Sequence, residues 1–249
     1  MAVSFKSTML PMALAVALSF SAVGTASADA LTENFDNGVP FDWTVVNNSE
    51  PVGGTSWFTG SPVSLNAYEG AADSYVAANY NAVANAGPIS DWLILPTSTY
   101  RNGDTLSFFT STASPSFYAD NLEVRFSNVG GTDVGTTASS VGTFGTLLLS
   151  INPAENVGAY PESWTRYSVS LSGLTGDTTG AFALRYVLSN GGLNGNASNY
   201  VGVDSLSITP AAVTAVPEME TYLMMAAGLG LVGWMRKRKS RAAQVSKAA

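Results

Sequence analysis

The sequence predicts an all-β domain, an antiparallel sandwich of two β-sheets. Apolar and polar residues alternate with a period of two in several short segments of the middle of the chain, as half-buried strands require, and no helical periodicity appears there. Turn-forming Gly, Asn and Asp separate these segments and allow the positive φ angles of tight turns. The alternating segments are 122–127, 167–171 and 182–188, and the turns are 102–104, 130–133 and 190–192. Short strands joined by turns over residues 29–210 favour one two-sheet domain with little helix.

Two further strands follow from single segments. The run from Trp92 to Leu95 is continuously apolar and closed by Pro96. This pattern predicts a strand that is covered on both faces and that ends where proline removes a backbone donor. A last strand is expected over 201–209, and residues 211–215 are expected to link the domain to the C-terminal tail.

The N-terminus has the features of a secretory signal peptide, predicted over residues 1–28. Lys6 precedes an apolar stretch from Met9 to Phe20, and Ala26-Ser27-Ala28 has the small residues that signal peptidase recognises. Asp29 would therefore begin the mature protein. The alternative is an uncleaved N-terminal helix, which would make the small-residue pattern accidental.

The C-terminal residues 216–249 combine a short motif, an apolar segment and a basic end. The motif is Val216-Pro217-Glu218, a transmembrane helix is predicted over 222–235, and the stop-transfer cluster is Arg236-Lys237-Arg238-Lys239. This order resembles the PEP-CTERM sorting signal of Gram-negative, exopolysaccharide-producing bacteria, with Met219 where the family has a second proline. The resemblance implies an exosortase-type transpeptidase as partner, transient residence in the inner membrane, and then the cell surface or extracellular matrix.

A plain membrane anchor is the alternative for this tail. The fourteen apolar residues from Tyr222 to Met235 span about 21 Å as a helix, whereas the hydrocarbon core is about 30 Å thick. This short length favours a transient segment that is later cleaved.

The composition excludes several chemistries. The chain has no cysteine and no histidine, which excludes Ser-His-Asp and Cys-His catalysis and zinc sites built on these ligands. Residues 29–215 carry 16 carboxylates against 4 arginines, a formal charge of −12. Such a surface repels nucleic acid, so no nucleic-acid partner is expected, and it suits divalent cations.

The mature body resembles the choice-of-anchor J domains, which are similar to cleaved-adhesin modules and more distantly to MAM and carbohydrate-binding domains. The resemblance implies a jelly-roll β-sandwich displayed outside the cell, without fixing a ligand. It rests on the order of Glu33-Asn34-Phe35-Asp36, Phe41-Asp42-Trp43, Trp57-Phe58, 90–96, 121–127, Trp164-Thr165-Arg166-Tyr167 and 203–208.

A structural calcium ion is the cofactor that the sequence favours. Glu33 has the strand parity of Phe35, and Asp204 has that of Leu206, so both carboxylates are predicted to face the apolar side. A buried carboxylate needs a cation or hydrogen-bond donors, and hard oxygen ligands suit Ca²⁺. Domains of the resembled type often hold Ca²⁺ between their first and last strands, and Asp73 is a third candidate ligand. Alternatively, both carboxylates lie in solvent or pair with arginines, Arg101 or Arg185.

The candidate ligand-binding residues are Tyr118, Tyr160 and Tyr200, because they lie among Ser, Asn, Gly and Pro, where exposed rings that stack on sugars are expected. The function favoured by the sequence is non-enzymatic adhesion, or a structural role in a biofilm or exopolysaccharide. A carbohydrate-binding module for exopolysaccharide is the alternative. A glycosidase, which needs two carboxylates, is a third reading, although no motif selects such a pair.

The tail and the signal peptide generate the first prediction. Intact-mass analysis of native protein should show an N-terminus at Asp29 and loss of the residues after about Glu218, because both ends carry processing signals. Mature protein that retains its full tail would contradict sorting and leave a simple anchor.

Overall fold

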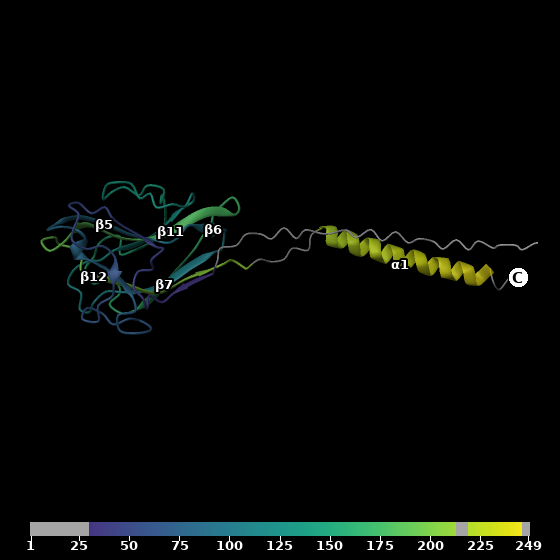
Figure 1. Ribbon diagram of the computed structural model, residues 1–249, viewed down its shortest axis with the longest axis horizontal. Coiled ribbons are helices and arrows are strands. Elements are labelled where there is room, and N and C mark those ends of the chain that lie inside the picture. The colour runs from purple at the N-terminus through teal and green to yellow at the C-terminus, as the bar shows by residue number, and fades with distance from the viewer. Residues whose placement is uncertain (1–29, 213–218, 246–249) are drawn as a thin grey trace, which may run out of the picture.

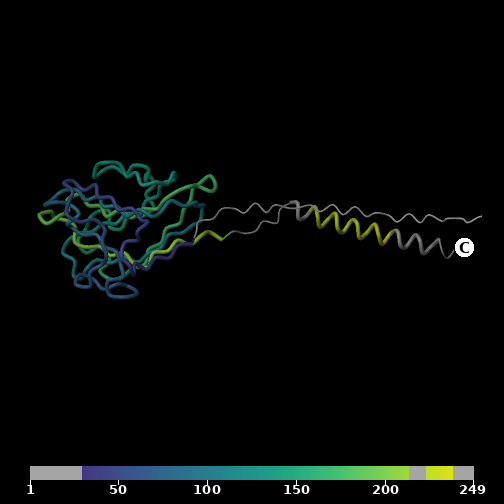
Figure 2. Tube along the Cα trace, in the orientation of Figure 1, coloured from purple at the N-terminus to yellow at the C-terminus, as the bar shows by residue number. Residues whose placement is uncertain are grey.

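The computed structural model describes residues 30–212 and 219–245. Two antiparallel sheets face each other and form a β-sandwich, as predicted, with β5, β6 and β11 in one layer and β7 and β12 in the other (Figure 1). The first strand and the last strand lie side by side, so the described chain enters and leaves the sandwich at the same end (Figure 2).

Sheet A has the order β10-β7-β12-β4-β3, and β1 also pairs with β12. β12 is the shared strand, because β7 takes one edge while β4 and β1 divide the other between them. The strands are β1 (Leu31–Glu33), β3 (Phe58–Thr59), β4 (Val76–Asn79), β7 (Thr105–Ser111), β10 (Thr165–Ser170) and β12 (Tyr200–Thr209).

Sheet B has the order β2-β5-β11-β8-β9, and β6 also pairs with β11. β5 and β6 pair with successive parts of β11. β5 ends just before Pro96, where the sequence predicted the end of this strand. The strands are β2 (Thr44–Asn47), β5 (Gly87–Ile94), β6 (Ser98–Tyr100), β8 (Leu122–Ser127), β9 (Thr146–Ile151) and β11 (Thr178–Gly191). One short 3-10 helix, η1 (Tyr80–Ala82), follows β4.

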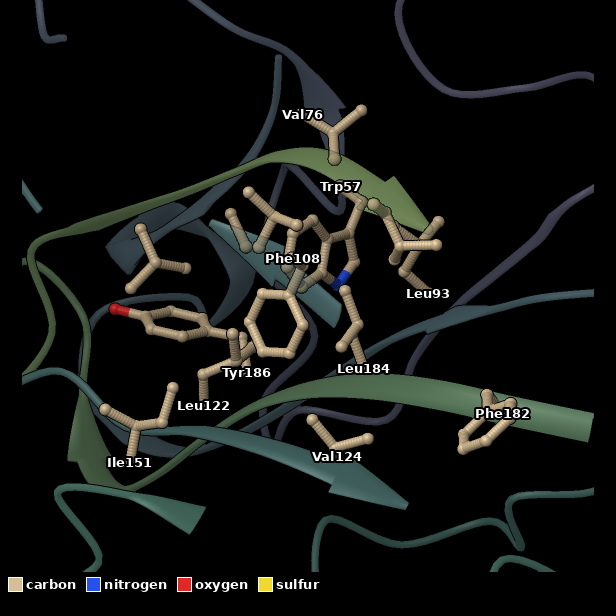
Figure 3. Packing of buried hydrophobic residues seen from close by; sticks show 14 of the residues in the cluster. Trp57, Val76, Leu93, Phe108, Leu122, Val124, Ile151, Phe182, Leu184 and Tyr186 are labelled. Atoms are coloured by element: carbon tan, nitrogen blue, oxygen red, sulfur yellow. The ribbon is translucent and has the colours of Figure 1, made fainter. Parts of the chain in front are cut away.

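The main core lies between the sheets, where inward residues of both layers interdigitate (Figure 3). Sheet B contributes Leu93, Val124 and Leu184, and β7 of sheet A contributes Phe108. This packing follows from the period-two alternation, since residues i and i+2 of a strand lie on the same face.

A second apolar layer covers the outside of sheet B. Trp92, Ile94 and Ala183 point away from the main core and pack under Phe144, which comes from the long loop 128–145. The rings of Trp92 and Phe144 lie 5.8 Å apart between centroids. The prediction that Trp92–Leu95 is covered on both faces is therefore confirmed, because alternate residues of this run enter two different cores.

One predicted turn needs correction. The turn predicted at 190–192 begins later, since β11 continues to Gly191 and Gly192 takes the positive φ of 97°. The C-terminal helix α1 (Met219–Val245) includes the apolar segment 222–235 and continues through the basic cluster. Within the part of the chain that the structure describes, no helix has the length and apolarity needed to cross a membrane.

Several predictions of the sequence fall outside the described residues. They are the signal peptide and its cleavage site, the sorting motif Val216-Pro217-Glu218, and most of the linker 211–215.

Phe144 generates the second prediction. Phe144→Ala should lower the free energy of unfolding by about 3–5 kcal/mol, because the loss of this buried ring leaves a cavity over Trp92. Urea unfolding of the mature protein measures the change. Phe41→Ala is the matched control, since the Phe41 side chain is 100% exposed and its loss should change stability by less than about 0.5 kcal/mol. Equal effects of the two variants would show that loop 128–145 does not cover sheet B.

Candidate functional site

The two carboxylates predicted to share a calcium ion lie on opposite faces of sheet A. Glu33 pairs with Leu206, which is in the main core, whereas Asp204 pairs with Phe109 on the outer face. The parity prediction for Asp204 is wrong because β12 contains a bulge, with a register shift after Asp204 and a φ of 47° at Ser205. One extra residue in a strand moves the side chains before it to the other face.

Asp204 is buried and obtains its donors from the backbone. One carboxylate oxygen accepts from the amides of Tyr68 and Glu69 at 2.8 and 3.1 Å, and the other accepts from the Ser205 amide at 2.6 Å. Burial raises the pKa of Asp204, and these hydrogen bonds oppose the shift. The carboxylate therefore fixes loop 66–74 to the last strand without needing a cation.

The other calcium candidates do not join Asp204. Glu33 accepts from the Phe35 amide at 2.7 Å, and Asp73 is exposed. Arg101 and Arg185 form ion pairs with Asp177 and Glu123, so they are not the partners of Glu33 or Asp204. No three His, Cys, Asp or Glu residues come together as a metal site in residues 30–212 and 219–245. The calcium response stays a prediction of the sequence.

Two of the three candidate tyrosines are core residues. Tyr160 is 3% exposed and Tyr200 is 6% exposed, so the prediction that their rings are exposed is wrong. The Tyr160 hydroxyl hydrogen-bonds Thr110 at 2.6 Å, and the Tyr200 hydroxyl hydrogen-bonds Tyr75 at 2.8 Å. Tyr160 packs in the main core, and Tyr200 packs with Tyr75 and Ala77 on the outer side of sheet A. Residues far away in the sequence therefore bury both rings, and both hydroxyls have buried hydrogen-bond partners.

Tyr118 is half exposed, as predicted, and lines a pocket of about 160 Å³. The pocket lies where the loop before β12 meets the loop before β8, and it is lined by Tyr80, Tyr118, Gly192, Leu193, Ser198 and Asn199. Leu193 is 75% exposed. Two aromatic rings and a leucine beside an amide match the usual composition of small-ligand sites.

A buried carboxyl group holds the wall of this pocket. Asp120 accepts from the Asn199 amide at 2.8 Å, from the Tyr186 hydroxyl at 2.6 Å and from the Thr112 hydroxyl at 3.0 Å. The Asn199 side chain donates to Ser116, whose hydroxyl donates to the Tyr118 carbonyl. Burial raises the pKa of Asp120 to about 6. The pocket is thus tied to the core by a connected polar network.

A second, larger pocket of about 360 Å³ lies on the outer side of sheet B, between loop 128–145 and the loop after β9. Glu50, Glu155 and Arg185 line it. Glu155 accepts from the amide and hydroxyl of Ser189, and Glu50 accepts from the Ala138 amide. Both carboxylates therefore hold neighbouring loops.

Arg185 joins loop 128–145 to sheet B at the floor of the second pocket. Its guanidinium lies 4.8 Å from the centroid of the Trp92 ring and donates to Ser90, to Glu123 and to the Ala138 carbonyl. Burial lowers the pKa of Arg185, and Glu123 opposes this shift.

Asp91 is a buried group that the sequence reasoning missed. It alternates with Ile89 and Leu93 on β5 and therefore points into the main core, where one oxygen accepts from the Ser56 hydroxyl and the other has no partner. Burial raises its pKa to about 8. The available signal was its inward parity, since a carboxyl at an apolar position of a covered strand is rare.

The fold is similar to solved adhesin and carbohydrate-binding domains. The K1 cleaved adhesin domain of Lys-gingipain from Porphyromonas gingivalis matches with a TM-score of 0.51 and 20% identity, covering 74% of this chain and 99% of that domain. The K2 cleaved adhesin domain of Lys-gingipain matches with a TM-score of 0.49 and 17% identity, and the match covers 73% of this chain and 99% of that domain. A xylan-binding domain from Paenibacillus barcinonensis matches with a TM-score of 0.40 and 15% identity, and the match covers 77% of this chain and 100% of that domain. No protein-family model and no curated protein matches the chain.

Asp91 generates the third prediction. Because its pKa is higher in the folded protein than in the unfolded chain, its stabilising contribution is complete below about pH 4 and is lost as the pH rises to about 8. The slope reaches at most about 1.4 kcal/mol per pH unit. Asp120 adds a loss of the same sign that ends near pH 6.

Asp91→Asn should therefore flatten the stability profile between pH 6 and 8, a window in which the chain has no histidine to titrate. Urea unfolding at half-unit pH intervals measures the profile. Asp120→Asn is the control, because it should leave the slope between pH 7 and 8 unchanged. A steep fall that persists in Asp91→Asn would contradict the assignment.

Proposed function

We propose that this chain is an exported, non-enzymatic β-sandwich protein of a Gram-negative surface or matrix, where it contributes to adhesion or to exopolysaccharide structure. An exosortase-type system processes its tail. The observation that carries the proposal is the Tyr118 pocket, in which the half-exposed ring of Tyr118 and the partly buried Tyr80 lie at loops that the Asp120 network ties to the sandwich.

The similarity to the K1 adhesin domain supports the fold of this proposal. The features beyond the fold come from the chain itself. Two large side chains that line the pocket are exposed, Tyr118 at 50% and Leu193 at 75%, and Phe117, which precedes Tyr118 in the chain, is 74% exposed. Clustered exposed apolar residues mark contact surfaces more often than isolated ones do.

The buried acids support a binding role over catalysis. A glycosidase needs an accessible carboxyl group with a raised pKa beside a second carboxylate. Asp91 and Asp120, whose pKa values burial raises to about 8 and about 6, are 0% exposed. They cannot contact a substrate without unfolding of the sandwich, whereas display and adhesion need no such group.

Carbohydrate binding is the second candidate function, and the composition of the Tyr118 pocket favours it. Aromatic rings stack on the apolar face of sugar rings, and the side-chain amide of Asn199 suits hydrogen bonding with a sugar hydroxyl group. The pocket of about 160 Å³ fits the end or a single unit of a glycan rather than a long segment.

Tyr118 generates the fourth prediction. Tyr118→Ala should weaken binding of the mature protein to matrix polysaccharide purified from the producing cells by about tenfold, because an aromatic contact contributes roughly 0.5–1.5 kcal/mol beyond the buried area. Tyr118→Phe should retain most of the binding. Phe41→Ala, which removes an exposed ring far along the chain, should leave it unchanged. Isothermal titration calorimetry provides the affinities.

The same preparations should release no reducing sugar from a polysaccharide panel. Turnover that disappears in Glu50→Gln or Glu155→Gln, with circular dichroism unchanged, would replace the binding role by a glycosidase. Wild-type protein that does not associate with the matrix would remove the adhesion role.

A further inference from the structure

The outer face of sheet A carries a second surface that the Tyr118 pocket does not include. On strands β10, β7 and β12, half of this face is a ladder of hydroxyl groups, and hydrogen bonds between neighbouring strands join them. Ser107 and Ser207 are 2.9 Å apart between hydroxyl oxygens, and Thr105 and Ser170 are 2.7 Å apart. The members of the ladder are Thr105, Ser107, Ser168, Ser170, Ser207 and Thr209.

An aromatic platform borders this hydroxyl ladder. The ring of Tyr68 stacks on Phe109 of β7, with 3.8 Å between the centroids and 15° between the planes. Asp204 fixes Tyr68 from below by accepting its backbone amide, and Tyr68 remains 46% exposed. Tyr68 also meets Trp164 edge to face, with 6.4 Å between the centroids, and its exposed ring surface is available for stacking on a sugar ring.

A cation stands beside this platform. Arg166 of β10 pairs directly with Phe109, and side chains of such cross-strand pairs are about 5 Å apart at Cβ. Arg166 is exposed and donates to the Ser107 hydroxyl at 3.0 Å. The guanidinium therefore lies between the aromatic platform and the hydroxyl ladder.

Arg166 differs from the other arginines of the sandwich. Arg101, Arg125 and Arg185 each form an ion pair with a carboxylate, at 3.6, 2.6 and 3.2 Å. Within residues 30–212, Arg166 has no carboxylate within ion-pair distance. In a body as acidic as this one, a cation that no internal acid neutralises is available to an external anion.

We propose that the outer face of sheet A binds an acidic polysaccharide, with a sugar ring on Tyr68 and the carboxylate of a uronic acid unit on Arg166. The guanidinium fork matches a carboxylate in two hydrogen bonds. The hydroxyl ladder offers donors and acceptors to the next sugar units. This site goes beyond the proposed function, because it lies on another face and selects the charge of the glycan.

The neighbouring acids set the limits of this site. Asp204 of β12 and Arg166 of β10 both pair with Phe109 of β7. The Asp204 carboxylate, however, is buried and accepts hydrogen bonds from the backbone amides of Tyr68 and Glu69. Glu69 is exposed and follows Tyr68 in the chain. Arg166 must therefore overcome repulsion from an acidic surface, so loss of its charge should abolish the preference for anionic glycans.

Calorimetry with polygalacturonate and with its fully methyl-esterified, neutral form tests the proposal on the mature protein. The wild type should bind the acidic polymer more tightly than the ester. Arg166→Gln should weaken binding of the acid form by at least about tenfold, as expected for a lost charge-assisted hydrogen bond, and leave the ester unchanged. Tyr68→Ala should weaken both.

Two matched variants exclude indirect effects. Thr132→Glu lowers the net charge by the same one unit on the exposed loop over sheet B, and it should leave the preference for the acid form intact. Tyr118→Ala should also leave it intact, so failure of this site is distinguishable from failure of the Tyr118 pocket. Equal affinities for acid and ester in the wild type would overturn the proposal, as would equal losses in Arg166→Gln and Thr132→Glu. Poly-glutamate that binds as tightly as polygalacturonate would overturn the assignment to a glycan.

Discussion

The bulge in β12 is the constraint on which the arrangement of sheet A depends. β12 must pair with β7 along one edge and with both β4 and β1 along the other, and the change of partner occurs at Asp204 and Ser205. The positive φ at Ser205 moves Asp204 to the outer face while Val203 and Leu206 stay in the core. Asp204 can then accept the amides of loop 66–74, which places Tyr68 on Phe109.

Buried acids serve the sandwich as structural acceptors. Asp120 and Asp204 collect hydrogen bonds from loop backbones and hydroxyl groups, so that long connections are held to the sheets without disulfides, which the chain cannot form. Such bonds to a carboxylate are stronger than bonds between neutral groups, and they satisfy donors that the loops would otherwise bury. Asp91 differs because one of its oxygens has no hydrogen-bond partner, so this buried carboxyl group lowers the stability of the fold near neutral pH.

The outer faces of the two sheets differ in how loops cover them. Loop 128–145 packs on sheet B through Phe144 and is held there by Arg185, beside a pocket of about 360 Å³. Sheet A stays open over its hydroxyl ladder, and aromatic residues of loops cover only the other half, where Trp164 lies above Gly202. The open half of sheet A and the Tyr118 pocket are therefore the surfaces on which binding is proposed.

The sequence by itself determined the sandwich, the doubly covered strand at Trp92–Leu95, and the exclusion of chemistry based on histidine or cysteine. These conclusions depend on local periodicity and on composition, which do not require knowledge of distant partners. The exposure of Tyr118 was also predictable from its polar neighbours. The similar neighbours of Tyr160 and Tyr200 misled the same reasoning, because Tyr160 packs into the main core and residues distant in the sequence cover Tyr200.

Only the tertiary structure decided on which face of sheet A Asp204 lies, and that Tyr68, Phe109 and Arg166 are neighbours there. The register of β12 with β7 shifts by one residue between Asp204 and Ser207, and this single extra residue reverses the parity that the sequence indicates. Tyr68, Phe109 and Arg166 are separated by 41 and 57 residues in the chain and meet only through the register of β7 with β10 and the anchoring of loop 66–74. Pairing between distant strands is a property of the whole fold, so no local pattern encodes it.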